Sequence, residues 1–263
     1  MDLQLNGKKA LVTGSSRGLG FAVATLLAAE GADVSINGRT QAGIDEALNK
    51  IKKVTGAAAH GFIADLASPE EPARVVDAAS AAMGGLDILI TNTGGPKPGK
   101  FETMTDADWL TAFNLLLMSH VRMIRQALPY LRKSSSPAVL TITSSAVKQP
   151  IPNLVLSNSL RAATVGLTKT LALELGCEGI RFNSILPGWT DTERVQTLMK
   201  DRSVQNKSTM EQELAKQAAD SPFNRIATPA EFAYAAVFLV SPRASYVTGT
   251  MLPVDGGTIK GLL

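Results

Sequence analysis

Short apolar runs alternate with longer amphipathic stretches along the whole chain. The short runs predict strands, because several are continuously apolar, as in parallel strands that are covered on both faces. The longer stretches carry apolar residues at helical spacing and predict helices. The expected strands are residues 9–13, 32–36, 59–64, 86–91, 138–143, 180–186 and 250–254, and the expected helices include 18–30, 41–54, 69–83, 106–132, 153–176 and 228–240.

This alternation predicts an α/β fold with a Rossmann-type, doubly wound parallel sheet of about seven strands. Helices are expected on both faces of the sheet, joined to the strands by right-handed crossovers. We find no internal repeat, low-complexity tract or linker, so residues 1–263 are expected to form a single domain. A hydrophobic content of 45% is enough for one sizeable core.

One polar region interrupts the alternation. Residues 190–224 separate the sixth expected strand from the helix at 228–240, and they contain helical pieces but no strand. An insertion at the strand ends of an α/β sheet often forms a lid over the substrate. A solvated helical hairpin with no such role is the alternative interpretation.

Composition excludes several classes of function. The formal net charge is +3, and Lys and Arg are spread along the chain, which disfavours nucleic-acid binding. No apolar run reaches the ~18 residues that span a bilayer, and the polar segment MDLQLNGKKA lacks the apolar part of a secretory signal. Cys177 is the only cysteine, which is typical of a reducing compartment. A cytoplasmic protein without membrane or nucleic-acid partners is therefore expected.

A glycine-rich turn follows the first strand. The segment ALVTGSSRGLG places Gly14, Gly18 and Gly20 between that strand and the opening of a helix. Glycine tolerates positive φ and lets the backbone approach a pyrophosphate, while the helix N-terminus offers unpaired N–H groups. A glycine triplet alone would also suit an ordinary tight turn, but the flanking strand, the helix and a second βαβ unit favour dinucleotide binding.

The end of the second strand indicates which dinucleotide binds. An Asp or Glu there would hold the ribose 2′-hydroxyl and repel a 2′-phosphate. The chain instead has Asn37-Gly38-Arg39, with Arg17 inside the glycine turn. Two guanidinium groups suit a phosphate, so NADP(H) is favoured over NAD(H). The alternative is that Arg39 only begins a solvated helix.

These motifs closely resemble those of the short-chain dehydrogenase/reductase family over nearly the whole chain. SPRASYVTGTMLPVDGG is similar to the family's C-terminal signature. The resemblance implies a cofactor site at the ends of successive strands, which adds further residues to the two arginines. Together the expected cofactor residues are Gly14, Ser16, Arg17, Gly18, Leu19 and Gly20 in the glycine turn, Asn37 and Arg39, Asp65 and Leu66 in ADLA, Asn92 and Gly94 in the altered segment TNTG, Arg161, and Pro187, Gly188, Thr190 and Thr192 in NSILPGWTDT.

The resemblance also implies a catalytic site, and there the chain departs from the family. Asn114 in AFNLLL and Ser144 in TITSSA match two members of the family's catalytic tetrad. In the segment NLVLSNSLRAATVGLTKTLALEL, however, Ser157 stands where the catalytic Tyr is expected and Arg161 where the Lys is expected. The step of 13 residues from Ser144 to Ser157 is the family's Ser-to-Tyr spacing. The three tyrosines of the chain lie on other expected elements: Tyr130, Tyr234 and Tyr246.

This exchange removes the family's proton relay. In the family, the Tyr gives a proton to the carbonyl oxygen as hydride arrives, and the Lys lowers the pKa of the Tyr and holds the nicotinamide ribose. A phenol has a pKa of about 10, whereas the pKa of an alcohol is much higher, and serine is shorter by a whole ring. Arg161 could still bind ribose hydroxyls, but it stays protonated at any working pH.

Three hypotheses about function remain. The favoured one is an NADP(H)-dependent oxidoreductase of a carbonyl or alcohol substrate in which another group protonates the product. Lys148, on the loop after Ser144, is the candidate donor because burial can depress the pKa of a lysine, although an exposed loop lysine is the simpler interpretation. The second hypothesis is an NADP(H)-binding protein without turnover, acting as a sensor or partner subunit. The third is a non-redox lyase or isomerase.

Two further expectations concern metals and assembly. His60 and His120 have no carboxylate or cysteine partner at metal-ligand spacing, so no metal site is expected. In the family, the helices corresponding to 106–132 and 153–176 pair across a dimer axis, usually within a tetramer. The resemblance therefore implies a homotetramer or homodimer that acts on a small molecule.

Overall fold

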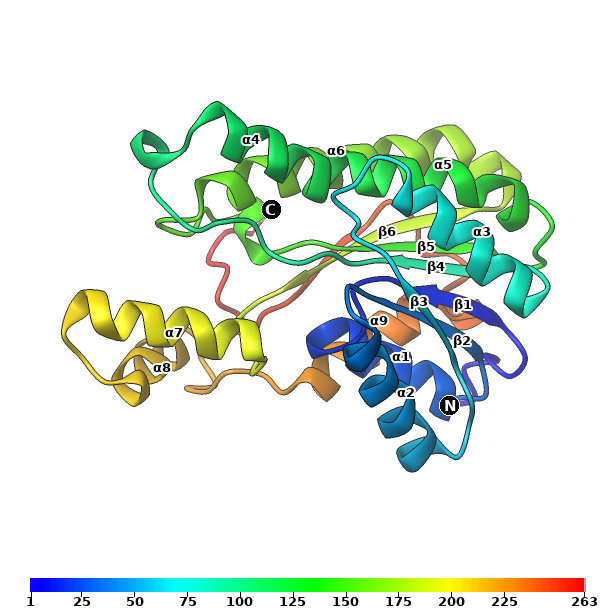
Figure 1. The fold of residues 1–263 in the computed structure, drawn as a ribbon, viewed down its shortest axis with the longest axis horizontal. Coiled ribbons are helices and arrows are strands. Elements are labelled where there is room, and N and C mark those ends of the chain that lie inside the picture. The colour runs from blue at the N-terminus through cyan, green and yellow to red at the C-terminus, as the bar shows by residue number, and fades with distance from the viewer. Residues whose placement is uncertain (263) are drawn as a thin grey trace.

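The computed structural model describes residues 1–262, and a single sheet of seven parallel strands forms its centre (Figure 1). The strand order is β3-β2-β1-β4-β5-β6-β7, which confirms the predicted Rossmann-type α/β fold. Because the order reverses between β1 and β4, ligands are expected outside the carboxyl ends of these strands. The strands are β1 (Lys9–Val12), β2 (Asp33–Gly38), β3 (His60–Ile63), β4 (Ile88–Thr91), β5 (Ala138–Ile142), β6 (Arg181–Pro187) and β7 (Met251–Val254).

Helices cover both faces of the sheet (Figure 1). One face carries α1 (Gly18–Ala29), α2 (Gln41–Thr55) and α9 (Pro229–Val240), whose core includes Leu27 and Phe232. The other face carries α3 (Glu71–Met83), α5 (Ser119–Leu131) and α6 (Val155–Leu175), whose core includes Met123 and Phe182. These four side chains are fully buried, so each face of the sheet has its own apolar core.

The helix expected over 106–132 is interrupted by a π turn. It consists of α4 (Asp106–Phe113), a π-helical segment (Asn114–Met118) and α5. At this wider turn the backbone N–H of Ser119 donates to the carbonyl of Asn114. The hydroxyl of Thr164 on α6 donates to the carbonyl of Leu116 at 2.6 Å. The π turn therefore lies against α6, at a point where such turns often mark functional sites.

The insertion at 190–224 contains two helices, α7 (Glu193–Asn206) and α8 (Met210–Ala219), and no strand, as the sequence predicted. The hydroxyl of Thr192 caps α7, and a capping box of Thr209 and Gln212 begins α8. The two helices lie side by side and project beyond the carboxyl ends of the strands (Figure 1). Among residues 1–262, no helix has the length and apolar character needed to cross a membrane.

Candidate active site

The glycine turn is packed so closely that it admits no side chain at two positions. A Cβ on Gly20 would lie 2.6 Å from the carbonyl oxygen of Gly14, and one on Gly14 would lie 2.7 Å from that of Asn92. Gly14 and Gly18 also have positive φ, at 54° and 62°. A Cβ on Gly94 would meet nothing within 4 Å, so open space borders the turn. A tight backbone next to open space fits the pyrophosphate and ribose of a dinucleotide.

Polar side chains from neighbouring strands hold this turn in place. The amide of Asn92, after β4, donates to the carbonyl of Gly14 at 2.9 Å, and Thr13 Oγ1 donates to the carbonyl of Asn92 at 2.9 Å. The hydroxyl of Ser15, which the sequence analysis did not single out, donates to Val12 and accepts the backbone N–H of Asn37. The turn is thus fixed to β1, β2 and β4 before any ligand binds.

The side chain of Asn37 holds the glycine turn through hydrogen bonds. Its Oδ1 accepts the N–H of Gly14 at 3.2 Å, and its Nδ2 donates to the carbonyls of Phe62 at 3.2 Å and Ala64 at 3.3 Å. With an exposed fraction of 1%, Asn37 positions the turn and lies under the surface. Among the cofactor residues predicted from sequence, its contribution is therefore indirect.

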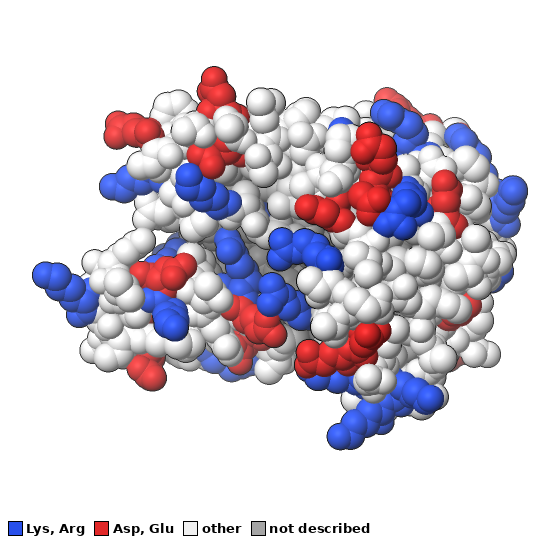
Figure 2. Space-filling model, viewed as in Figure 1, with Lys and Arg blue, Asp and Glu red and all other residues white. Residues whose placement is uncertain are grey.

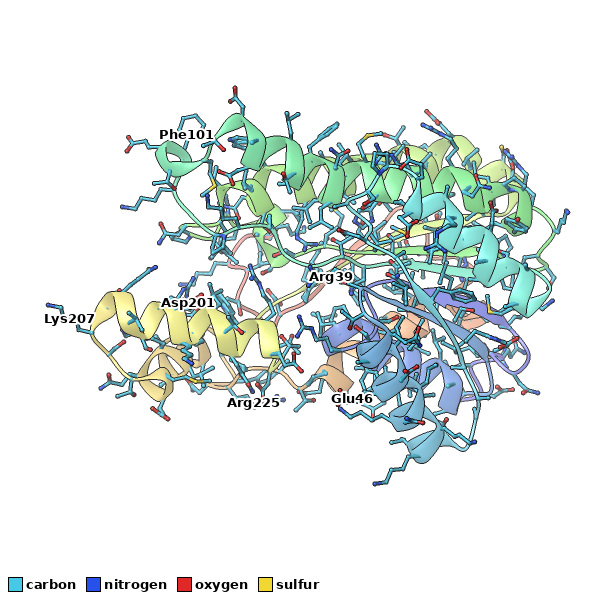
Figure 3. The ribbon with its side chains drawn as sticks, viewed as in Figure 1. Arg39, Glu46, Phe101, Asp201, Lys207 and Arg225 are labelled. Carbon is cyan, nitrogen blue, oxygen red and sulfur yellow. The ribbon has the colours of Figure 1, made fainter. Side chains whose placement is uncertain are left out.

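The two arginines predicted to read a 2′-phosphate are both on the surface. Arg39 follows β2, is exposed, and makes no ion pair within residues 1–262. Arg17 pairs through Nη1 with Glu193 Oε2 at 2.6 Å, which joins the glycine turn to the start of α7. Figure 2 shows Lys and Arg side chains gathered around a hollow beside α7, and Figure 3 places Arg39 at that opening.

The segment after β6 faces the same turn. The N–H of Gly188 donates to the carbonyl of Val254 at 3.0 Å, and a Cβ on Gly188 would lie 2.6 Å from the Cα of Asp255. The methyl of Thr192 lies 3.8 Å from the position of a Cβ on Gly18. This segment therefore closes one side of the opening. The other residues of the predicted set lie as follows: Ser16 beside Gly38, Leu19 half-buried on α1, Asp65 exposed and Leu66 buried after β3, Pro187 at the end of β6, and Thr190 buried.

The departure from the expected catalytic pair lies on the inner face of α6. Ser157, Arg161, Thr164 and Thr168 follow one another at helical spacing and are all buried. The Nε of Arg161 donates to Ser157 Oγ at 3.2 Å, and its Nη1 donates to the carbonyl of Ile142 at the end of β5, also at 3.2 Å. The structure thus brings the two exchanged residues into direct contact.

The charge of Arg161 has no carboxylate partner among residues 1–262. Burial, and then the positive charge of Arg194, lower the pKa of Arg161 to about 10, so the guanidinium is still protonated at neutral pH. A buried charge without a counter-ion is costly. The donors of Arg161 that neither Ser157 nor Ile142 occupies are therefore suited to electron-rich oxygen atoms of a ligand.

His120 lies near the charge of Arg161, although no motif in the sequence indicated a place for this histidine in the site. It is buried on α5, and its Nδ1 lies 2.7 Å from the hydroxyl of Thr91 at the end of β4. Burial, and then the positive charge of Arg161, lower the pKa of His120 to about 3. The ring is therefore neutral at physiological pH. The sequence gives no sign that His120 on α5 lies near Arg161 on α6, because their proximity is created by the fold.

The remaining predicted catalytic residues come from three segments. Asn114 begins the π turn, and its side chain donates to the carbonyl of Leu110 and accepts from Arg122. Ser144 follows β5, and its hydroxyl accepts the N–H of Ala146 at 3.1 Å. Lys148 follows the short 3-10 turn Ser145–Val147, is partly buried, and makes no side-chain hydrogen bond within residues 1–262. In that part of the chain, no group of three or more His, Cys, Asp or Glu residues could hold a metal ion.

Comparison with known proteins identifies the family. Residues 14–258 match the family described as Enoyl-(Acyl carrier protein) reductase. The 7alpha-hydroxysteroid dehydrogenase of Escherichia coli K12 is 31% identical over 99% of this chain and 98% of its own length. The chain belongs to the short-chain dehydrogenase/reductase family. It is therefore an oxidoreductase of the NAD(P)-dependent type that acts on alcohols and carbonyl compounds.

Two solved structures of this family are also similar. The L-sorbose reductase of Gluconobacter frateurii, complexed with NADPH and L-sorbose, has a TM-score of 0.94 and 33% identity, with all of both chains covered. A short-chain oxidoreductase of Pseudomonas aeruginosa PAO1, described as containing an atypical catalytic center, has a TM-score of 0.87 and 27% identity, covering 96% of this chain and 97% of that one.

The depressed pKa of His120 predicts a particular dependence of stability on pH. In the folded protein His120 has a pKa of about 3, whereas in the unfolded chain it is near 6.5. Between these values only the unfolded chain binds the proton, so the free energy of unfolding falls as the pH is lowered. His120→Gln removes this contribution. We expect the variant to lose about 2 kcal/mol less than the native protein between about pH 7 and about pH 5.

The measurement is urea unfolding at a series of pH values. His60→Gln, which replaces the other of the two histidines in the chain, is the matched control. An unchanged pH dependence in His120→Gln would show that His120 is not the buried neutral group described above.

Proposed function

We propose that the protein is an NADP(H)-dependent oxidoreductase that interconverts a carbonyl and an alcohol with an atypical proton donor. The observation that supports the proposal is the tightly packed glycine turn after β1, in a chain whose Ser157 and Arg161 contact each other on α6. The glycine turn is held by hydrogen bonds from Asn92 and Asn37 and admits no side chain at Gly14 or Gly20, which suits the close approach of a pyrophosphate. When bound, NADP(H) supplies or accepts the hydride.

NADP(H) is favoured over NAD(H) by the charges at the opening. Arg39 is exposed without a carboxylate partner, and the end of β2 lacks the acidic residue that would repel a 2′-phosphate. Arg17 lies on the same side but is paired with Glu193. A 2′-phosphate would compete for Arg17, because two guanidinium groups and one phosphate form stronger charge-assisted hydrogen bonds than one exposed ion pair.

Ser157 is the group that we propose to donate a hydrogen bond to the substrate oxygen. Because Arg161 Nε donates to Ser157 Oγ, the hydroxyl proton of Ser157 is directed elsewhere. Ser144 has its oxygen occupied in the same way by the N–H of Ala146. As hydride reaches the carbonyl carbon, negative charge develops on the oxygen, and the guanidinium of Arg161 stabilises it.

Serine alone is too weak an acid to complete the reaction, so a second group must supply the proton. Lys148 is our candidate, because it lies four residues after Ser144 and has no competing hydrogen bond in the described chain. We propose that its ammonium proton reaches the substrate oxygen through water, while Ser144 and Ser157 orient that water. In the oxidation direction the same groups accept the proton.

A second candidate function, NADP(H) binding without turnover, is favoured by one observation. Arg161 stays protonated and Ser157 lacks the reach of a tyrosine, so no group at the family's usual position can donate a proton directly. Such a protein would act as a sensor or partner subunit.

We further propose that the protein is cytoplasmic and that it forms a homotetramer or homodimer. The assembly is supported by the outward-facing apolar side chains Leu110 on α4 and Leu173 on α6.

Removal of the Arg39 charge should change the cofactor preference. We expect Arg39→Ala to weaken NADPH binding on the order of tenfold and to leave NADH binding almost unchanged, because only NADPH carries the 2′-phosphate. Fluorescence titration of the reduced cofactors measures both constants. Arg125→Ala, which removes an exposed arginine on α5, is the control. Equal losses for both cofactors would contradict the assignment of Arg39 to the phosphate.

Replacement of Lys148 should separate proton supply from cofactor binding. We expect Lys148→Met to lower kcat by about tenfold or more and to leave NADPH affinity unchanged, because the lysine acts only on the proton. Turnover is measured as NADPH consumption with ketones, β-ketoesters, enones and quinones. Near-native turnover by Lys148→Met would refute the role of this lysine.

The double replacement Ser157→Tyr with Arg161→Lys restores the family's pair and serves as the internal control for the same substrates. Consumption of NADPH by the native protein would establish the proposed function. Consumption by the double variant alone would show that the site accepts carbonyl compounds but that the native residues do not reduce them. The second candidate function would then be preferred.

A further inference from the structure

A cavity of ≈ 380 Å³ lies between the insertion and the loop that precedes α6. We call it the α7–α8 cavity. It is lined by Ser145, next to Ser144, and by Trp189, in the segment that closes the cofactor site. Its volume is within the range of about 300–1,000 Å³ that is typical of small-molecule sites. The cavity therefore borders the segment that carries Ser144 and lies under α7 and α8.

Carboxamide side chains make up half of the polar residues that line this cavity. Three of them make no side-chain hydrogen bond within residues 1–262: Asn153, Gln205 and Gln217. Two others, Gln149 and Asn206, keep part of their hydrogen-bonding capacity. Gln149 accepts the N–H of Lys260, and Asn206 donates to Glu213. Each amide offers both a donor and an acceptor. A hydroxyl group also donates and accepts, so a ligand with several hydroxyls could satisfy all of them.

An apolar wall completes the lining. It consists of Pro150, Ile151 and Pro152 on the loop before α6, Ile259 near the C-terminus, and the indole of Trp189. The aliphatic side chains and the face of the indole cannot hydrogen-bond to hydroxyls but can cover C–H groups. Amides together with an apolar wall fit a molecule that presents hydroxyls at its edge and C–H groups on its face.

The charges of the lining disfavour an anionic ligand. Arg202 is the only Lys or Arg among the lining residues, and it lies over the ring of Trp189 with its guanidinium carbon 5.2 Å from the ring centroid. Two carboxylates, Glu213 and Asp220, line the same cavity. Glu213 is held by Lys216, Ser208 and Asn206. The cavity thus has no surplus of positive charge.

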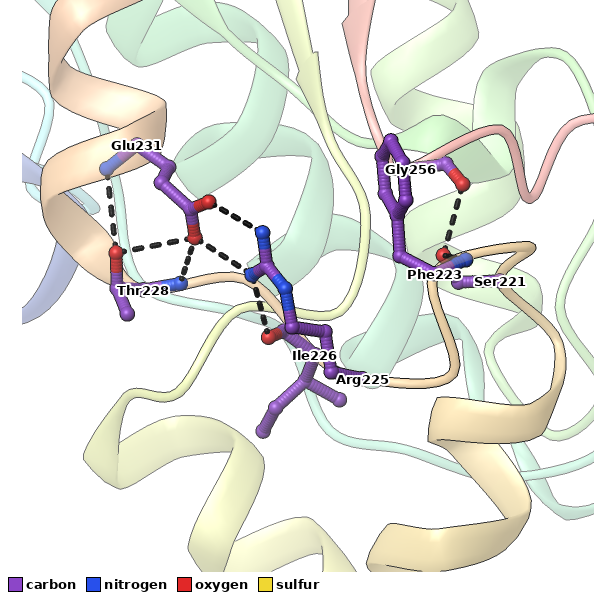
Figure 4. Close-up of polar contacts among 7 residues, drawn as sticks. All are labelled: Ser221, Phe223, Arg225, Ile226, Thr228, Glu231 and Gly256. Atoms are coloured by element: carbon purple, nitrogen blue, oxygen red, sulfur yellow. Dashed lines mark hydrogen bonds and ion pairs between the residues drawn. The ribbon is translucent and has the colours of Figure 1, made fainter.

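The base of the insertion is anchored, which fixes the cavity wall. The hydroxyl of Ser221, after α8, donates to the carbonyl of Gly256 at 2.8 Å, and Arg225 forms two hydrogen bonds with Glu231 at the start of α9 (Figure 4). Thr228 adds a capping box with the same glutamate. α8 is therefore connected to the C-terminal segment that also lines the cavity, so these two walls are held together before a ligand enters.

From this lining we infer that the α7–α8 cavity binds the polyhydroxylated part of the substrate, so that the substrate is a neutral sugar or polyol. The inference rests on the proposed function, because the cavity is the substrate portion of the same site. Hydroxyls of the ligand pair with Gln205, Gln217 and Asn153, and its C–H face packs against Ile151 and Trp189. The reacting carbon then lies toward Ser144 and Ser157.

Binding can be tested without turnover. The NADP⁺-loaded protein is titrated with D-fructose and D-mannitol, with cyclohexanone as an apolar probe and acetoacetate as an anionic probe, and saturation-transfer NMR detects each ligand. We expect the two polyhydroxylated probes to bind more tightly than the others. Gln205→Leu and Gln217→Leu should each weaken their binding by about fivefold to tenfold, because each variant removes a hydrogen bond to the ligand.

Gln196→Leu is the matched control, because Gln196 is an exposed amide on α7 that does not line the cavity, and it should bind the probes like the native protein. Preferential binding of cyclohexanone or acetoacetate, or no effect of either cavity variant, would overturn the inference. Sugar binding that is never followed by hydride transfer would support the cavity assignment and contradict the proposed function. Reduction of other carbonyls without any sugar binding would support the proposed function and overturn the inference about the cavity.

Discussion

The buried guanidinium of Arg161 constrains the whole candidate active site. It lies where α6, the end of β5 and the helix that carries His120 meet, and its described contacts are a hydroxyl and a carbonyl, with no carboxylate. Because a buried charge is costly, the groups in contact with it are neutral and offer electron pairs, although the positive charge of Arg194 is near enough to lower its pKa. His120 is accordingly neutral, and Ser157 presents its oxygen. A ligand oxygen is the natural remaining partner.

This constraint separates two tasks that the family's Tyr–Lys pair performs together. The charge of the lysine is kept by Arg161, so stabilisation of a developing oxyanion is possible. The acidity of the tyrosine is not kept by Ser157, so in the proposed function the proton comes from another group. Around both, the glycine turn, Asn92 and Asn37 form a rigid network that does not depend on either exchanged residue. The cofactor site and the proton relay can therefore differ independently.

The fold followed from the sequence because hydrophobic periodicity reports burial directly. Strands such as 138–143 and the helix at 153–176 were predictable, and so was the absence of a strand from 190–224. The π turn at Asn114–Met118 was not, since one additional residue in a helical turn hardly changes the apolar pattern. This turn is recognised in the fold, where the hydroxyl of Thr164 on α6 donates to the carbonyl of Leu116 within the π turn.

The motifs indicated the tight turn at Gly14 and the position of Ser157 and Arg161 on one helix, and the roles of these residues stay predictions. The candidate site was less predictable where a side chain can turn inward or outward. Asn37 is expected at the cofactor, and the structure adds that its amide holds the turn from below, because it is surrounded by backbone carbonyls. His120 and the amides of the α7–α8 cavity were missed, since packing between distant segments creates their environments.

The central claim is that this site transfers hydride although the tyrosine is absent. The most direct measurement uses NADPH that carries deuterium at the transferable position, together with a neutral sugar ketone and the native protein. Mass spectrometry of the product then reports the transfer. The account predicts deuterium on the carbon that was the carbonyl. Unlabelled substrate recovered from protein that has bound both cofactor and sugar would contradict it.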